Sequence, residues 1–217
     1  MIPASAFDDI IDELEKRPLE VNNYRVKTGS GRSQAFGIVG RRSAPPDYSR
    51  QCWIRPELYS YLLDFGETYV NDISWNAITL NQNFLCKPHY DSHNRGPSLL
   101  CAFGDYEGGE LVIHEGDLSG NYDVRHNPLT TDFSKVLHSV KPFTGNRYSV
   151  VYYYFEIKPW IGREYLKGEV RFVGGDYVFY RGGVKCTGLP HPLNGFKRQP
   201  KIDKVVPDSV EAKNGTD

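Results

Sequence analysis

The chain has few cysteines, a single methionine and no long apolar run. Its four cysteines, Cys52, Cys86, Cys101 and Cys186, stand far apart without a C-x-x-C pair, which excludes zinc held by cysteine and favours a thiol-reduced protein. No stretch approaches the roughly 18 apolar residues that a membrane span needs. The acidic N-terminus, MIPASAFDDIIDELEK, differs from a secretory signal. We therefore expect a soluble, intracellular protein with no membrane partner.

The chain also lacks a strong charge of either sign. Its 26 basic and 27 acidic side chains give a net charge of −1, which argues against a generally polybasic nucleic-acid binder. Aromatic and turn-forming residues are abundant instead, with 15 Tyr, 11 Phe, 21 Gly and 14 Pro, and this mixture favours strands joined by turns. The length of 217 residues predicts one domain over residues 1–196, followed by a polar, flexible tail over residues 197–217.

The periodicity of apolar residues predicts two helices ahead of a series of strands. Apolar residues at helical spacing follow an S-x-x-D capping pattern at Ser5 and stop at Pro18. A second helix is expected from Pro56 to Gly66. Strands are expected near residues 35–39, 78–83, 98–103, 109–114, 135–140 and 147–156, with a hairpin at 169–181 that turns at Gly174, Gly175 and Asp176. This order predicts a mainly β fold with flanking helices, whose core is a double-stranded β-helix of the jelly-roll or cupin type.

Residues 21–55 differ from the rest in carrying seven basic residues and one acid, Asp47. The basic residues are Arg25, Lys27, Arg32, Arg41, Arg42, Arg50 and Arg55. Residues 44–47, with the sequence APPD, are expected to form a turn. The segment has two interpretations: a solvated loop, or a clamp for an anionic substrate such as a nucleic-acid backbone, with Arg32, Arg41 and Arg42 as candidate contacts.

A candidate metal site begins with the H-x-D pair of His89 and Asp91. Side chains at i and i+2 of an extended segment point to the same side, so both can approach one ion. A third ligand is expected from another strand across the barrel. His138, in the apolar context VLHSV, is preferred over His114 and His126 because an arginine follows it. Two imidazoles and one carboxylate form the ligand set of a non-haem iron site that leaves positions open.

The arginine that follows is Arg147. The intervening KPFTGN has the Pro and Gly of a turn, which predicts His138 and Arg147 on adjacent strands. A guanidinium binds a carboxylate through two parallel hydrogen bonds, so Arg147 is a candidate to hold a dicarboxylate co-substrate beside the metal. Ser149 points to the same face and offers a hydroxyl donor to the same carboxylate.

Between residues 77 and 156, the order H-x-D, H and R-x-S resembles the Fe(II)/2-oxoglutarate-dependent dioxygenases. The segments NQNF, HYDSHNRGPS and GDYEGGEL are most similar to the TET/JBP branch and its algal and viral relatives, which oxidise the methyl group of thymine or 5-methylcytosine. GDYEGGEL also resembles the corresponding turn of prolyl hydroxylases. The resemblance implies that His89, Asp91 and His138 bind iron and that Arg147, supported by Ser149, binds 2-oxoglutarate.

The resemblance also implies the cofactors Fe(II), 2-oxoglutarate and O2, with ascorbate as a reductant. Asn81 and Asn83 become candidates to orient 2-oxoglutarate, and Asn94 becomes a candidate substrate contact. The substrate it implies is a methylated or plain pyrimidine base in DNA or RNA. Two alternatives remain open: a prolyl-hydroxylase-like oxygenase acting on a peptide or amino acid, and a cupin-type binding module without turnover.

Overall fold

The computed structural model describes residues 1–21, 25, 27–41 and 44–155, together with four short strands nearer the C-terminus. The helical elements are η1 (Ala4–Phe7), α1 (Asp8–Lys16), α2 (Gln51–Ile54) and α3 (Pro56–Tyr69). The strands up to residue 155 are β1 (Gly29–Arg41), β2 (Ala44–Tyr48), β3 (Ala77–Cys86), β4 (Ser98–Phe103), β5 (Tyr106–Gly108), β6 (Leu111–Ile113), β7 (Gly120–Tyr122), β8 (Leu129–Thr131), β9 (His138–Val140), β10 (Phe143–Gly145) and β11 (Tyr148–Tyr153). The later strands are β12 (Glu169–Val173), β13 (Asp176–Arg181), β14 (Val184–Lys185) and β15 (Val205–Val206).

The two long helices lie where the apolar spacing predicts them, but their ends differ. The capping prediction at Ser5 is wrong, because Ser5 lies inside the 3-10 turn η1 and no side chain caps the start of α1. Helix α3 continues through Gly66 to Tyr69. A Cβ at Gly66 would lie 2.5 Å from the Trp75 ring and 2.8 Å from the Tyr152 ring. This glycine therefore permits close packing of the helix on the sheet and does not end the helix.

The larger sheet is antiparallel, with the order β2-β1-β3-β11-β4-β8. Strand β1 is much longer than the strand expected at 35–39 and pairs along most of β3. The turn expected at residues 44–47 is wrong, since this segment forms β2 at the edge of the sheet. An edge strand tolerates Pro45 and Pro46, because a missing backbone donor costs little where no further strand pairs.

The smaller sheet has the order β7-β6-β9, and the segment around His89 extends it by a bridge to His138. From β3 onward the chain passes back and forth between the two sheets. It runs from β3 in the larger sheet to the His89 segment in the smaller one, then to β4 in the larger and to β6 and β7 in the smaller. It then returns to the larger sheet for β8, to the smaller for β9 and to the larger for β11. Eight strands wound in this way form a double-stranded β-helix. The predicted mainly β fold with flanking helices and a jelly-roll core is confirmed.

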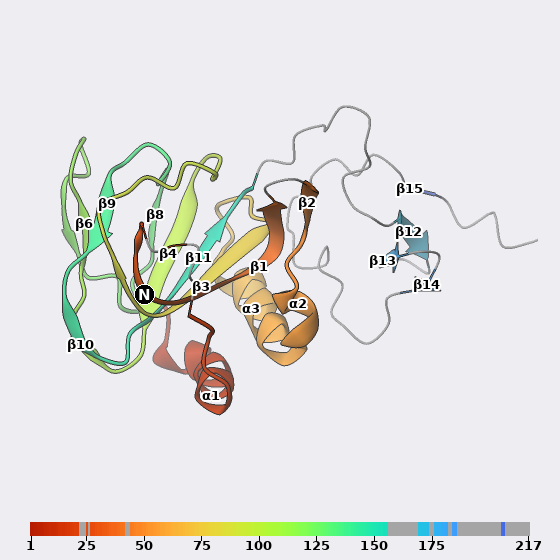
Figure 1. Ribbon diagram of the computed structural model, residues 1–217, viewed down its shortest axis with the longest axis horizontal. Coiled ribbons are helices and arrows are strands. Elements are labelled where there is room, and N and C mark those ends of the chain that lie inside the picture. The colour runs from red at the N-terminus through yellow and green to blue at the C-terminus, as the bar shows by residue number, and fades with distance from the viewer. Residues whose placement is uncertain are drawn as a thin grey trace, which may run out of the picture.

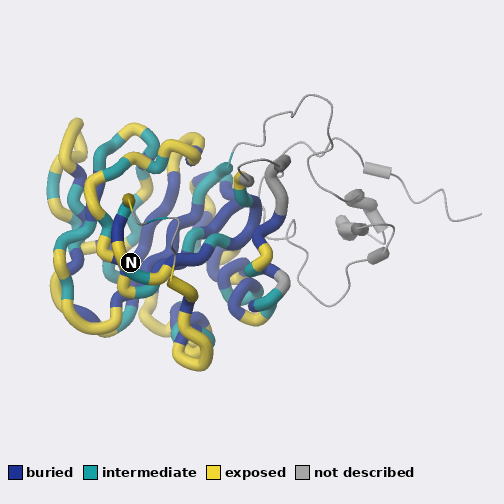
Figure 2. Tube along the Cα trace, viewed as in Figure 1, coloured by how far each residue is buried: buried dark blue, intermediate teal, exposed yellow. Residues whose placement is uncertain are grey.

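Each face of the larger sheet has its own core. In β11, Tyr148, Val150 and Tyr152 pack with the helices, whereas Val151 and Tyr153 face the cluster of the smaller sheet. In Figure 1, α1, α2 and α3 lie together on one side of the larger sheet, and β6 and β9 lie on the other. Figure 2 shows the strands between these layers as mostly buried. The space between the two sheets is where the candidate site lies.

The C-terminal part contains the hairpin predicted at 169–181. Strands β12 and β13 pair antiparallel, with Val173 opposite Asp176, and Gly174 and Gly175 lie outside the described residues. Within the tail expected at 197–217, the two residues of β15 pair parallel to β12, and the other residues lie outside the described part. Among the described helices, each is too short or too polar to cross a bilayer.

Candidate metal centre

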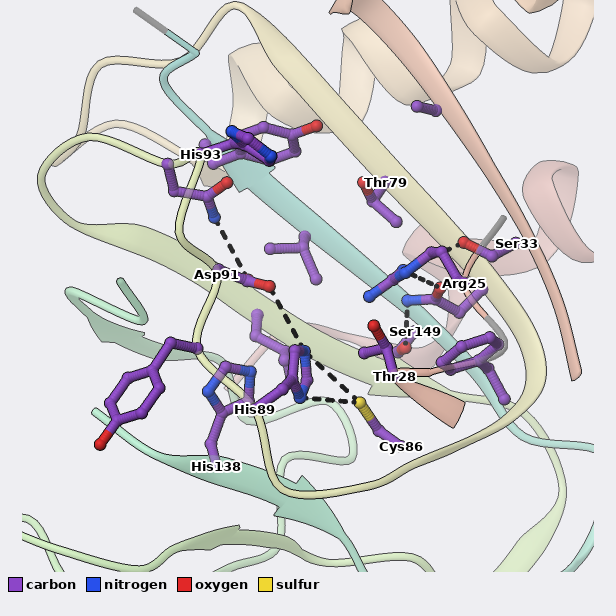
Figure 3. A pocket seen from close by; sticks show the side chains of 18 of the residues that line it. Arg25, Thr28, Ser33, Thr79, Cys86, His89, Asp91, His93, His138 and Ser149 are labelled. Atoms are coloured by element: carbon purple, nitrogen blue, oxygen red, sulfur yellow. Dashed lines mark hydrogen bonds and ion pairs between the residues drawn. The ribbon is translucent and has the colours of Figure 1, made fainter. Parts of the chain in front are cut away.

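Three side chains converge on one point at the wall of a cavity between the two sheets. The ligand atoms of His89, Asp91 and His138 all lie within 4.8 Å of one another. The Nε2 atom of His89 is 3.4 Å from Oδ1 of Asp91. The cavity has a volume of about 820 Å³, and Figure 3 shows the three side chains lining it. Two imidazoles and a carboxylate at this spacing can share one cation.

Backbone pairing positions the two histidines. The amide of His89 donates to the carbonyl of His138 at 3.0 Å, and the amide of His138 donates back at 3.1 Å. The expectation that His138 comes from across the barrel is therefore wrong. After β3 the chain leaves the larger sheet and joins the edge of the smaller one beside β9, so the two histidines are ladder neighbours.

Both imidazole rings present the same nitrogen to the cavity. Nδ1 of His89 lies 2.9 Å from the Lys87 carbonyl, and Nδ1 of His138 lies 3.1 Å from the Val136 carbonyl. A carbonyl only accepts a hydrogen bond, so each Nδ1 carries a proton, and in the neutral form of each ring Nε2 keeps a lone pair for a metal. This backbone support is typical of histidines that bind metals.

The charges at the site suit a cation. Burial raises the pKa of Asp91, but the hydrogen bond from His89 and the nearby positive charges outweigh it and hold the pKa below its usual value. Burial lowers the pKa of His138, which stays neutral at pH 7. Burial also acts to lower the pKa of His89, yet its hydrogen bonds to Asp91 and Cys86 raise it to about 10. Without metal, a proton therefore takes the place of the cation between His89 and Asp91.

Asn94 supports the carboxylate from behind. Its Nδ2 donates to Oδ2 of Asp91 at 3.2 Å and lies 3.2 Å from the Ser98 hydroxyl, and the side chain is buried. One carboxylate oxygen of Asp91 is thus occupied, while Oδ1 faces the histidines. Asn94 also lines the cavity, so its predicted contact with substrate stays open beside its role in orienting Asp91.

Arg147 extends into the same cavity just before β11. It is 2% exposed, its Nε donates to the Gly109 carbonyl at 3.2 Å, and its guanidinium lies 5.4 Å from the Tyr106 ring and 5.7 Å from the Phe143 ring. Among the described residues, its buried Nη2 has no hydrogen-bond partner. A buried charged donor without a partner is costly, so this nitrogen indicates a missing acceptor. His138 and Arg147 do not lie on adjacent strands as expected; they belong to facing sheets.

The two predicted asparagines of β3 have different surroundings. Asn81 is buried, lines the cavity and donates from Nδ2 to the Ser149 hydroxyl at 3.2 Å. Ser149 accepts that bond, so its own proton can point to a ligand. Asn83 is exposed, has a φ of 50° and lies outside the cavity. Its Oδ1 accepts from the Arg147 amide at 2.8 Å, which fixes the backbone of the arginine.

The cavity also contains Arg25, which no sequence motif singles out. Its Nη1 donates to the Ser33 hydroxyl at 3.2 Å and to Oδ1 of Asn81 at 3.3 Å, and its guanidinium lies 4.8 Å above the Phe84 ring. The excess of basic residues at 21–55 is the one signal that included it. No periodicity in that segment separates Arg25 from its neighbours, since the turn that carries it precedes β1.

Another proposed substrate contact, Arg32, and the two rival histidines, His114 and His126, lie outside the cavity. Arg32 is exposed and donates to the Leu19 carbonyl at 2.6 Å, outside the cavity. Arg41 is the last residue of β1, and Arg42 lies outside the described residues. The exposed His114 bonds to the Ser139 hydroxyl at 2.8 Å, and His126 stacks on Phe7. The roles proposed for Arg41 and Arg42 therefore stay predictions.

Gly109 makes room for Arg147, which gives a testable prediction. A Cβ at Gly109 would lie 2.8 Å from Cδ and 2.9 Å from Nε of Arg147, and the residue has a φ of +73°. We expect Gly109→Ala to displace the arginine, to lower the free energy of unfolding by about 1–3 kcal/mol and to weaken carboxylate binding. Gly116→Ala is the control, because its φ is +79° but nothing lies within 4 Å. Equal carboxylate affinities in the two variants, measured by calorimetry, would contradict this role.

No protein-family model matches the chain. A curated relative, a non-reducing polyketide synthase from Byssochlamys spectabilis, is 26% identical over an alignment of 182 residues that covers 72% of this chain and 8% of that protein. The chain therefore spans less than a tenth of the length of the curated relative that it matches.

Three similar solved structures have TM-scores between 0.45 and 0.48. NgTET1 in complex with 5mC DNA has a TM-score of 0.48 and 16% identity, covering 71% of this chain and 69% of that one. An oxidoreductase of the 2OG-Fe(II) oxygenase family from Burkholderia pseudomallei has a TM-score of 0.45 and 19% identity, covering 67% of this chain and 75% of that one. A Pseudomonas putida prolyl-4-hydroxylase has a TM-score of 0.45 and 15% identity, covering 71% of this chain and 89% of that one.

Proposed function

We propose that this chain is an Fe(II)- and 2-oxoglutarate-dependent oxygenase that hydroxylates an organic substrate. The observation that carries the proposal is the unpartnered, buried Nη2 of Arg147 in the same cavity as His89, Asp91 and His138. A site that bound only a metal would gain nothing from a desolvated guanidinium. A dicarboxylate that spans metal and arginine accounts for both features.

The residues present fit iron. Nε2 of His89, Nε2 of His138 and Oδ1 of Asp91 would hold Fe(II) on one face and leave the opposite positions open, the pattern of non-haem iron oxygenases. The backbone carbonyls behind both rings, and Asn94 behind the carboxylate, would keep the three donors in place.

The residues on the facing sheet fit the far carboxylate of 2-oxoglutarate. The free edge of Arg147 would donate to it, and Ser149, whose oxygen already accepts from Asn81, would add its own proton. Gly109 and Asn83 would place the arginine from either side. Apolar cavity walls at Val140 and Val151 would keep water away from this pairing and strengthen it.

Iron and 2-oxoglutarate, when bound, supply the activation of O2 that inserts oxygen into a substrate C–H bond while 2-oxoglutarate becomes succinate and CO2. The protein contributes binding, orientation and exclusion of water. The TET/JBP-like segments in the sequence make methylated and plain pyrimidines in DNA and RNA the first substrates to test, and proline-containing peptides the second. Mass spectrometry for the gain of one oxygen separates these classes.

The proposed function is tested without knowing the substrate. Fe(II) and 2-oxoglutarate are added to the protein without oxygen, and a visible charge-transfer band of the iron chelate is expected. After admission of air, the same sample should form succinate only if iron is present. A protein that shows neither the band nor iron-dependent succinate would contradict the proposal, and the barrel would then be a binding module.

A further inference from the structure

The side chain of Arg25 lines the cavity, and hydrogen bonds from one nitrogen of its guanidinium hold it in place. Its Nη1 takes both recorded hydrogen bonds, to Ser33 on β1 and to Asn81 on β3, and the Phe84 ring lies beneath its guanidinium. These contacts fix the plane of the group. A fixed guanidinium loses less entropy on binding a carboxylate or phosphate than a mobile one.

The other edge of this guanidinium is available. Among the described residues, Nε and Nη2 of Arg25 have no recorded hydrogen bond, and no carboxylate lies within ion-pair distance of them. Arg25 nevertheless lines the cavity, and its positive charge contributes to lowering the pKa of Asp91 and of His138. A second arginine therefore faces the region of the metal ligands with two donors unused.

The charges in the cavity indicate which kind of group would accept hydrogen bonds from these two nitrogens. The charged side chains that line it in the described part of the chain are Arg25, Arg147 and Asp91. With neutral histidines they sum to one positive charge, and an iron dication and a 2-oxoglutarate dianion cancel each other. The filled cavity thus keeps one positive charge, which a bound anion would neutralise.

2-Oxoglutarate does not account for Arg25, provided that the proposed function holds. Its two carboxylates are already assigned to the metal and to Arg147. Asn81 links Arg25 to Ser149, because it accepts from Arg25 and donates to the Ser149 hydroxyl. We propose that Arg25 receives one anionic group of the substrate, a carboxylate or a phosphate, and so orients the substrate toward the metal.

The first experiment separates Arg25 from co-substrate binding. Arg25→Gln removes the charge but keeps an amide that can bond to Ser33 and Asn81. In anaerobic titrations of the iron chelate band, we expect this variant to need the same 2-oxoglutarate concentration as the wild type, within about twofold. An increase of tenfold or more, about 1.4 kcal/mol, would show that Arg25 serves 2-oxoglutarate and would overturn the proposal.

The second experiment measures anion recognition with three probes of similar shape: benzoate, phenyl phosphate and the neutral benzamide. Calorimetry is done on protein loaded with Fe(II) and saturating 2-oxoglutarate without oxygen. We expect at least one of the two acids to bind roughly tenfold or more tighter than benzamide, as charge-assisted hydrogen bonds imply. Arg25→Gln should abolish this preference. The better acid shows whether the substrate group is a carboxylate or a phosphate.

Arg32→Gln is the matched control, because Arg32 is exposed nearby on β1 and lies outside the cavity. It should keep the preference for the acid. Equal binding of acids and benzamide in the wild type, or a preference that survives in Arg25→Gln, would overturn the proposal. If the wild type forms no chelate band, the proposed function fails instead, and the same probes on metal-free protein still test Arg25.

Discussion

Asp91→Asn is expected to abolish the iron chelate band. The substitution keeps the shape of the side chain but replaces the one anionic ligand with an amide, which binds divalent cations poorly. Changes behind the ligands of a metal site already cost ten- to a hundredfold in affinity. We therefore expect loss of the ligand itself to lower Fe(II) affinity by more than about a hundredfold, measured by anaerobic calorimetry.

Asp132→Asn is the matched control. Asp132 also has a lowered pKa, because hydrogen bonds from Ser134 and Lys135 outweigh burial, but it lies outside the cavity. It should bind Fe(II) like the wild type. Circular dichroism of both variants shows whether the fold is kept. If Asp91→Asn folds and still binds Fe(II) as tightly as the wild type, the three-residue metal centre is wrong.

Arg147→Gln has the second largest expected effect, on 2-oxoglutarate. Removal of one partner from a buried, hydrogen-bonded charge pair costs roughly 2–5 kcal/mol. The concentration of 2-oxoglutarate that gives half of the chelate band should therefore rise by more than about tenfold, while Fe(II) affinity in the absence of 2-oxoglutarate stays the same. That separation distinguishes a co-substrate contact from damage to the metal centre.

The control for this variant is Arg125→Gln. Arg125 lies 4.0 Å above the same Tyr106 ring and bonds to the Tyr106 carbonyl, but it does not line the cavity. Loss of either arginine removes a packing contact with Tyr106, but of the two only Arg147 lines the cavity. Equal effects of the two substitutions on 2-oxoglutarate affinity would assign Arg147 a packing role.

Features with a local signal were predictable from the sequence. The apolar segments expected as strands at 98–103 and 147–156 predicted β4 to the residue and β11 to within three residues, because both faces of these strands are buried. The spacing of His89 and Asp91 placed both on one side of the chain, since side chains alternate along an extended segment. Arg147 and Ser149 share the cavity for the same reason.

Features that arise from pairing between distant segments could not be predicted. The backbone bridge between His89 and His138 depends on which sheet the chain joins after β3, and no residue encodes that locally. Arg25 reaches the cavity because β1 pairs with β3 in one particular register, Ser33 opposite Asn81. Gly66 and the prolines of β2 were misinterpreted as breakers, because their effect depends on a ring packed nearby or on an edge position.

The paired backbones beneath the two histidines have a consequence for handling the protein. Two reciprocal amide–carbonyl bonds hold these residues together whether or not an ion is bound, so a chelator should strip the metal and leave the rings in place. Iron lost during purification would then be restored by simple reconstitution, with no refolding step.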